Sequence, residues 1–335
     1  MTTKILNNNL NKAKADKNDE FYTCLTDIEN EMRHYKAHFK DKVVYCNCDD
    51  PLVSNFFRYF SLNFEHLGLK KLIATCYQSD NAGVRTDLSS DTAVKIEYHG
   101  HPKVLGTPTD EDMNIVKLKS DGDFRSDECI EILKTADIVV TNPPFSLFRE
   151  YVEQLVEHDK SFIIVGSMNA ITYTDFFPLL QQNKVWLGNK SGVFDFEVPL
   201  SYDRSIAFMK DGKKYAKFGN VSWFTNLDIA KRHEDIVLYK KYNADNYPVY
   251  DNYNAIEVGK VKEIPIDYDG VMGVPITFLA KHNPNQFEVV GSDFQVRHGD
   301  LPELIKEGYV GKFDRAVLNG KRMFSRIFIK RVQPT

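Results

Sequence analysis

The chain has 335 residues, of which 42% are hydrophobic and 27% charged, so it can bury the core of one large α/β domain or of about two domains. Its formal net charge of -4 argues against non-specific adhesion to nucleic acid. No apolar run approaches the roughly 20 residues of a membrane span, and the N-terminus is rich in Asn and Lys where a secretion signal would be apolar. We therefore expect a cytoplasmic protein without membrane association.

The five cysteines are scattered along the chain without a C-x-x-C pair, which disfavours both a disulfide framework and a zinc site. We expect no metal. None of the cysteines follows a proline. The Pro-Cys nucleophile expected for methylation at a cytosine ring carbon is therefore missing.

The chain begins with a segment, residues 1–18, that is predicted to form a flexible basic arm. Its charged residues up to position 17 are Lys4, Lys12, Lys14 and Lys17 against Asp16 alone. Such an arm could become ordered on a phosphate backbone, or it could simply be a solubilising surface. A helix is then predicted from Thr26 to Phe39, because Thr26 and Glu29 have capping-box spacing.

A first βαβ unit is predicted next. Its strand, Val43–Cys46, is followed by Asp50 as a helix N-cap and Pro51 as the first helical residue. Gly68 is placed to end the helix, and Lys71–Tyr77 forms the next strand. Two strands joined by a helix are parallel, with a right-handed crossover.

A second βαβ unit follows a polar segment, residues 78–128, in which the alternating stretch 94–98 could belong to a hairpin. An apolar run ends at Thr141, helix 146–158 presents apolar side chains at core spacing, and strand 162–165 follows. The loop between strand and helix is thereby placed at the carboxyl edge of the sheet, where open α/β folds bind ligands.

Beyond about residue 185 the pattern changes to short β-like runs broken by Gly, Asn, Asp and Pro. Asn319-Gly320 is a strong hairpin signal between Ala316–Leu318 and Met323–Ile329. The last 35 residues are locally basic, with eight Lys or Arg against three acids. They could contact DNA or be a solvated surface.

The loop of the second unit, Asn142-Pro143-Pro144-Phe145, carries the chemistry. An aromatic amine is a poor nucleophile because its lone pair is delocalised into the ring. The Asn142 side-chain oxygen and the following backbone carbonyl can each accept one of its N–H groups and so direct the lone pair at a methyl donor. The two prolines stiffen the loop, and Phe145 offers a stacking face for a base. The alternative is that Asn-Pro-Pro is only a turn.

The first strand ends in residues 46–51, which contain no glycine and therefore lack the loop that would approach a pyrophosphate. S-adenosylmethionine carries no phosphate; its ammonium and sulfonium groups favour carboxylates. Asp49 is the better ligand, because Asp50 is expected to cap the helix. Asp123 and Phe124 form a second candidate that could bind and stack the adenine of the cofactor.

On these residues the chain resembles the EcoRI-type family of adenine-N6 DNA methyltransferases. The stretches that carry the resemblance are Asp19–Thr23, Val43–Pro51, Ser54–Phe57, Gly122–Ser126, Asp137–Tyr151, Trp186–Gly188, Thr225–Asp228, Tyr250–Tyr253 and Gly270–Leu279. The resemblance implies an α/β, Rossmann-like methyltransferase fold with a mostly parallel central sheet and a C-terminal target-recognition region. The core would span residues 19–187, and residues 188–335 would supply the remaining strands and target recognition.

The resemblance also implies roles for individual residues. Asn142, Pro143, Pro144 and Phe145 would hold a flipped adenine. The S-adenosylmethionine pocket would be lined by Phe21, Tyr22, Asn47, Asp49, Asp50, Asp123 and Phe124. Duplex DNA would be the substrate, the protein a monomer, and a cognate restriction endonuclease a partner without a stable complex. Two alternatives stay open: N-methylation of RNA or of a protein glutamine, and a catalytically silent DNA-binding module.

Overall fold

The structure is a computed structural model that describes residues 22–48, 54–76, 93–100, 112–198, 200 and 202–333. The chain divides into two compact units. The first is drawn from residues 1–168 and 188–227, and the second from residues 169–187 and 228–335. Each unit is built around a sheet of its own, and the first unit carries the predicted site.

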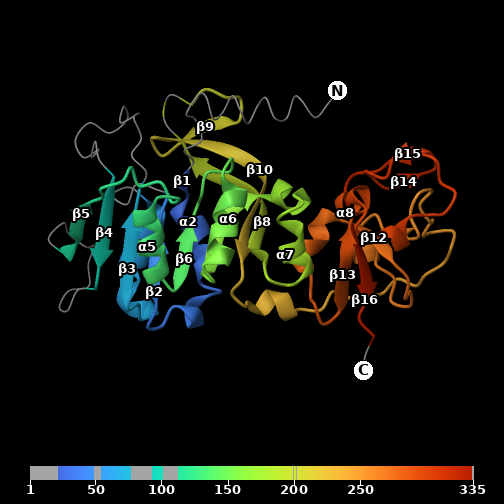
Figure 1. Cartoon of the computed structure of the whole chain (residues 1–335), viewed down its shortest axis with the longest axis horizontal. Coiled ribbons are helices and arrows are strands. Elements are labelled where there is room, and N and C mark those ends of the chain that lie inside the picture. Colours follow the sequence, from blue (N-terminus) through green and yellow to red (C-terminus); the bar gives the residue numbers. More distant parts are fainter. Residues whose placement is uncertain are drawn as a thin grey trace. The chain divides into compact units, whose positions relative to one another are not determined.

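The first unit is built on a ten-stranded sheet with the order β1-β8-β10-β7-β6-β2-β3-β4-β5, in which β9 also pairs with β10 (Figure 1). Its strands are β1 (Tyr22–Thr23), β2 (Val43–Cys46), β3 (Lys71–Thr75), β4 (Val94–Tyr98), β5 (Asn114–Lys117), β6 (Ile138–Thr141), β7 (Ser161–Ser167), β8 (Trp186–Glu197), β9 (Ala207–Lys210) and β10 (Lys213–Thr225).

Four neighbouring strands of this sheet, β7, β6, β2 and β3, are parallel. On one side of this block β4 pairs antiparallel with β3, and on the other β10 pairs antiparallel with β7. The expectation of a mostly parallel sheet is thus met in the central block, whereas the sheet as a whole is mixed. The block is parallel because helices provide the crossovers within each βαβ unit.

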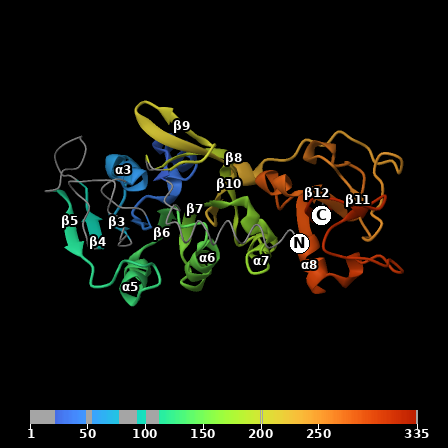
Figure 2. The same cartoon turned by 90° about the horizontal axis from the view of Figure 1, so that it is seen from above.

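The helices of this unit are α2 (Leu25–Met32), η1 (Lys36–His38), α3 (Asn55–Leu62), α4 (Phe64–Leu67), α5 (Asp127–Thr135) and α6 (Phe148–Glu157). Figure 2 shows α3 on one face of the sheet and α5 and α6 on the other. Two adjacent residues of β10 reflect this layering, since successive strand residues point to opposite faces. Trp223 packs edge-on against Phe56 of α3, and Phe224 packs against Phe148 of α6.

Both predicted βαβ units are confirmed, with differences at the helix ends. The predicted helix 26–39 ends at Met32, because the chain turns and continues as η1. The helix expected to start at Pro51 starts at Asn55, where Ser54 is the N-cap and accepts a hydrogen bond from the Phe56 N–H at 3.2 Å. Asp50 and Pro51 themselves lie outside the described residues.

The second unit contains a four-stranded sheet of order β11-β12-β16-β13 and a separate β14–β15 pair. Its strands are β11 (Ile256–Glu257), β12 (Met272–Pro275), β13 (Phe287–Ser292), β14 (Val317–Leu318), β15 (Lys321–Arg322) and β16 (Arg326–Arg331). Its helices are η3 (Met168–Thr172), α7 (Phe177–Gln181), η4 (Ala230–His233), η5 (Val261–Glu263), η6 (Ile276–Lys281), α8 (Asp293–His298) and η7 (Pro302–Leu304).

The Asn319-Gly320 hairpin is confirmed: both residues have positive φ, and Val317 pairs with Arg322 across the turn. Its second strand is shorter than expected, because the apolar run that follows leaves the hairpin and forms β16 at the centre of the four-stranded sheet. Among all the residues that the structure describes, none of the helices has the length and apolar character needed to span a bilayer.

A fully buried carboxyl group, Asp293, begins α8. One of its oxygens accepts the Arg326 N–H at 3.1 Å, and the other has no hydrogen-bond partner among the described residues. Burial raises the pKa of Asp293 to about 7 from an ordinary value of 3.8, although Arg315 and Arg326 favour its charged form. The second unit therefore carries an acid that loses its proton only near neutrality, well above the ordinary range of an aspartic acid.

This acid should make stability depend on pH. Between about pH 4 and about pH 7 the folded chain keeps a proton that the unfolded chain has released, so the Asp293 contribution to stability falls as pH rises. Asp293→Asn should flatten that fall and melt at a higher temperature than the parent at pH 8. Asp245→Asn, at an exposed position, is the control. Parallel melting curves for parent and Asp293→Asn from pH 5 to pH 8 would refute the assignment.

Candidate active site

The loop Asn142–Phe145 follows β6 directly and lies at the carboxyl edge of the parallel block. Asn142 is 8% exposed, Pro143 is buried, and Phe145 is half-buried. The Pro144 carbonyl accepts the Leu147 N–H at 2.9 Å, immediately before α6 begins. The loop is therefore fixed at both ends by regular structure, as expected from the sequence.

Asn47, at the end of the neighbouring strand β2, is bonded to both elements that flank this loop. Its backbone carbonyl accepts a hydrogen bond from the Thr141 hydroxyl, and its side-chain oxygen accepts one from the Tyr151 hydroxyl on α6. Asn47 is 5% exposed and Tyr151 fully buried. Burial holds the pKa of Tyr151 well above its ordinary range, so its hydroxyl stays a donor.

The loop that carries Asp123 and Phe124 reaches the same place from the other side. Phe124 is buried and packs edge-on against Tyr151, with ring centres 5.0 Å apart. Its carbonyl accepts from the Gln154 side chain of α6 at 3.0 Å. Tyr151, on α6, thus contacts both the end of β2 and the Asp123–Phe124 loop.

Asp123 is ionised and already paired. Arg125 donates to its carboxylate from Nε at 2.9 Å and from Nη2 at 2.6 Å, and this hydrogen bonding lowers the pKa of Asp123. Arg125 also reaches Glu150 of α6 at 3.1 Å. A cationic ligand would therefore meet this carboxylate with Arg125 as a competitor.

Gly122 explains how the Asp123 loop approaches the end of β3. Its φ is +78°, and a Cβ at this position would overlap the carbonyl oxygen of Cys76, the residue after β3. Only glycine permits both the backbone conformation and the close approach. Besides forming a turn, the Asp-Gly-Asp sequence thus allows this loop to pack directly against the backbone of Cys76.

Tyr22 lies on β1, which pairs with β8 so that Tyr22 faces Glu197 and Thr23 faces Phe196. The Phe196 ring packs edge-on against Phe145, with centres 6.3 Å apart. Strand β8 therefore connects β1 with the Asn142–Phe145 loop. Phe21, Asp49 and Asp50 fall outside the described residues, so their predicted roles stay predictions.

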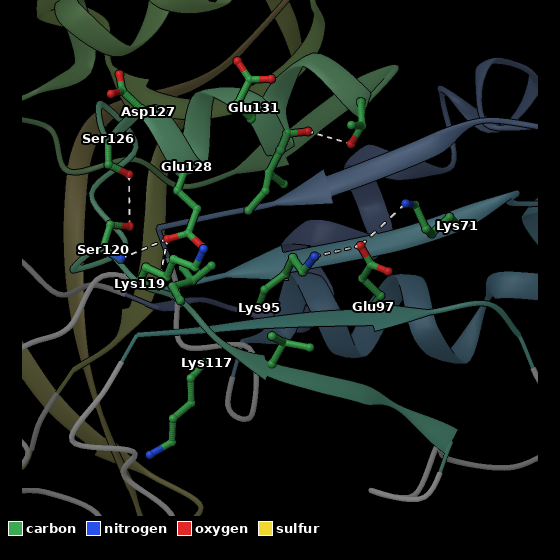
Figure 3. A pocket seen from close by; sticks show the side chains of 14 residues that line it. Lys71, Lys95, Glu97, Lys117, Lys119, Ser120, Ser126, Asp127, Glu128 and Glu131 are labelled. Atoms are coloured by element: carbon green, nitrogen blue, oxygen red, sulfur yellow. Dashed lines mark hydrogen bonds and ion pairs between the residues drawn. The ribbon is translucent and has the colours of Figure 1, made fainter.

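A separate cavity of about 740 Å³ lies between strands β3–β5 and α5 (Figure 3). Glu97 on its wall pairs with Lys95 at 3.2 Å and with Lys71 at 3.7 Å. Glu128 accepts the N–H groups of Lys119 and Ser120 at 2.9 Å each. None of the described site residues lines this cavity.

Sequence reasoning assigned Tyr151 only to the helix core and gave no role to Thr141, Arg125 or Phe196. One signal was available for Tyr151: a tyrosine on an otherwise apolar helix face must find a partner for its hydroxyl. The others depend on which elements become neighbours in space. That information is absent from local patterns.

A mixed sheet covered by helices, with an Asn-Pro-Pro-Phe loop at the carboxyl edge of its parallel block, is typical of a methyltransferase that acts on an amino group. The chain belongs to the EcoRI family of adenine-specific methyltransferases, whose model, described as "Adenine-specific methyltransferase EcoRI", matches residues 9–332. It is accordingly a site-specific DNA adenine methyltransferase.

Three relatives match over nearly their whole length. The chain is 47% identical to the type II methyltransferase M.EcoRI of Escherichia coli, covering 98% of each chain. It is 41% identical to M.MgeORF184P of Mycoplasma genitalium and 38% identical to M.MpnI of Mycoplasma pneumoniae, in both cases over 96% of this chain and 98% of the relative. No solved structure matches.

The hydrogen bond between Tyr151 and Asn47 can be tested by Tyr151→Phe. The substitution leaves a buried Asn47 oxygen without its donor, which costs about 1–3 kcal/mol. We expect the free energy of unfolding in urea to fall by that amount. Tyr239→Phe, at a position 60% exposed, is the control. Equal stability of Tyr151→Phe and the parent would show that this bond does not hold the site together.

Proposed function

We propose that this enzyme transfers a methyl group from S-adenosylmethionine to N6 of an adenine turned out of duplex DNA, at the carboxyl edge of the first sheet. The observation that supports this most strongly is the attachment of Asn47 to Thr141 and Tyr151. These bonds hold the proposed cofactor end of β2 beside the proposed catalytic loop.

Asn142 and the Pro143 carbonyl are proposed to bind the adenine amino group. Each oxygen accepts one N–H, which draws the nitrogen toward tetrahedral geometry and frees its lone pair. Both acceptors are uncharged, so no base removes a proton before the attack. Methylation makes the amine acidic, and the proton then leaves to water.

Phe145 is proposed to stack on the extruded base, an interaction worth roughly 1–3 kcal/mol. Its ring is half-buried and is buttressed edge-on by Phe196. The buttress limits the rotation of Phe145 and would present a fixed face to the base. Pro144 is proposed to preset the turn that places this ring.

The residues at this edge fit S-adenosylmethionine by their chemistry, since an ionised Asp123, the Phe124 ring and the Asn47 amide offer a carboxylate, an aromatic surface and neutral polar contacts. When bound, the cofactor supplies an electrophilic methyl group on sulfur. Asn47, Asp123, Phe124 and Tyr22 are proposed to line its pocket, together with Phe21, Asp49 and Asp50. Because Arg125 already pairs with Asp123, we assign the ammonium to Asp49.

We further propose that residues 19–187 form a Rossmann-like methyltransferase core, and that residues 188–335 supply the remaining sheet strands and target recognition. The basic arm, residues 1–18, contacts phosphates. The enzyme acts as a cytoplasmic monomer, either beside a cognate restriction endonuclease or as protection against one.

RNA and protein glutamine are the alternative methyl acceptors, because the same amine chemistry could methylate them. The proposal is tested by comparing them with DNA. Tritiated S-adenosylmethionine supplied with duplex DNA, RNA and protein extract separates the three. Label should enter DNA and reside in N6-methyladenine after digestion. Label confined to RNA or protein would overturn the proposal, and failure to bind S-adenosylmethionine in calorimetry would favour a silent binding module.

The role of Asn142 is tested by Asn142→Ala, which removes one acceptor for the amino group. Methyl transfer to duplex DNA should fall by at least about a hundredfold, on the scale of losing one preorganised transition-state contact. Calorimetric affinity for S-adenosylmethionine should be retained. Asn63→Ala, in the turn between α3 and α4, is a control for loss of a partly buried Asn. Near-parental methylation by Asn142→Ala would contradict the assignment.

A further inference from the structure

Strands β9 and β10 form a long hairpin in the first unit. They are joined by Asp211-Gly212, whose φ values are +49° and +75°. Positive φ at both turn residues is typical of the tight type I′ turn, which matches the twist of the two strands. The register pairs Lys210 with Lys213 and Phe208 with Tyr215, so all four side chains lie on one face of the hairpin.

The hairpin projects beyond the edge that carries the catalytic loop. β10 pairs with β7 only from Val221, which faces Ser167, the last residue of β7. Residues 213–220 therefore extend past the carboxyl end of the parallel block, by up to roughly 25 Å for eight extended residues. Asn142 lies at that same edge, because the preceding Thr141 faces Ile164 of β7.

The base of the hairpin is attached to the catalytic loop through aromatic rings. Phe218 of β10 packs edge-on against Phe196 at 5.6 Å, and Phe196 packs against Phe145 at 6.3 Å. A substrate that places a base against Phe145 must therefore pass close to the hairpin.

The hairpin is basic in a chain that is acidic overall. Residues 203–218 contain five Lys or Arg (Arg204, Lys210, Lys213, Lys214 and Lys217) against Asp203 and Asp211, whereas the whole chain has a net charge of -4. On the face defined above, Phe208 and Tyr215 stack with ring centres 5.8 Å apart, and Lys217 Nζ lies 5.7 Å from the Phe208 ring centre.

Two lysines of this face are available for a ligand. Lys210 and Lys217 are exposed, and neither makes an ion pair with any residue that the structure describes. Lys213 differs, since it pairs with Glu197 at 2.8 Å. Exposed ammonium groups beside stacked rings, at the edge where the proposed substrate would arrive, are typical of a surface that binds phosphodiesters.

We propose that this face of the β9–β10 hairpin binds the phosphate backbone of DNA next to the extruded base, with Lys210 and Lys217 as the principal contacts. The inference rests on the proposed function, since it assigns a surface to the substrate of that site. Contacts to phosphate give affinity and position without reading sequence. The hairpin should therefore contribute similar affinity to duplexes that contain the recognition sequence and to duplexes that lack it.

The test is the salt dependence of DNA binding by the full chain, measured by fluorescence anisotropy on a labelled duplex of unrelated sequence. A plot of log affinity against log salt has a negative slope, and each lost phosphate contact makes this slope less steep by about 0.9. The variant Lys210→Gln/Lys217→Gln should therefore have a slope that is less steep by about two. With the affinity at 1 M salt unchanged, this slope corresponds to an affinity about 60-fold lower at 0.1 M salt. Lys210→Arg/Lys217→Arg should restore both quantities, which separates loss of charge from loss of fold.

The matched control is Lys40→Gln/Lys70→Gln, which removes two exposed lysines near the starts of β2 and β3, at the opposite edge of the sheet. It should keep the parental slope. A parental slope in Lys210→Gln/Lys217→Gln, or equal losses in this variant and the control, would overturn the inference. Failure of this inference can be distinguished from failure of the proposed function. The proposed function fails if the parent enzyme transfers no methyl group to DNA.

Discussion

The architecture of the site depends on one residue, Asn47, and on the two hydroxyl groups that donate hydrogen bonds to it. Thr141 donates to its backbone carbonyl and Tyr151 to its amide oxygen, inside a region closed to water. Strand β2 ends at the proposed cofactor side, and β6 ends at the proposed catalytic loop. These bonds therefore hold the two proposed sides of the methyl transfer at a fixed separation. The proposed mechanism uses no general base, so orientation would be the main contribution of the site.

The sequence was sufficient wherever the signal was local. The Asn142–Phe145 loop, both βαβ units, the left-handed Gly68 and the Asn319-Gly320 hairpin all lie where their patterns place them. It failed where two local signals competed. The helix expected at Pro51 begins at Asn55, because Ser54 is an equally suitable cap.

Contacts between distant segments could not be predicted in this way. Phe196 meets Phe145 only because β8 returns to pair with β1, and Arg125 takes up the Asp123 carboxylate that sequence reasoning had reserved for a ligand. The mixed character of the sheet has the same origin. Its flanking strands join the block antiparallel, a choice that depends on connections and not on strand composition.

The charge distribution complements this geometry. An acidic chain must gain affinity for DNA from local basic surfaces, and the β9–β10 hairpin places one at the edge where the target base would enter. The most direct test is a crystal structure with duplex DNA and a non-reactive analogue of S-adenosylmethionine. The account predicts the analogue between Asn47 and Asn142, with an unstacked adenine on Phe145. An analogue bound in the cavity between β4 and α5 would contradict it.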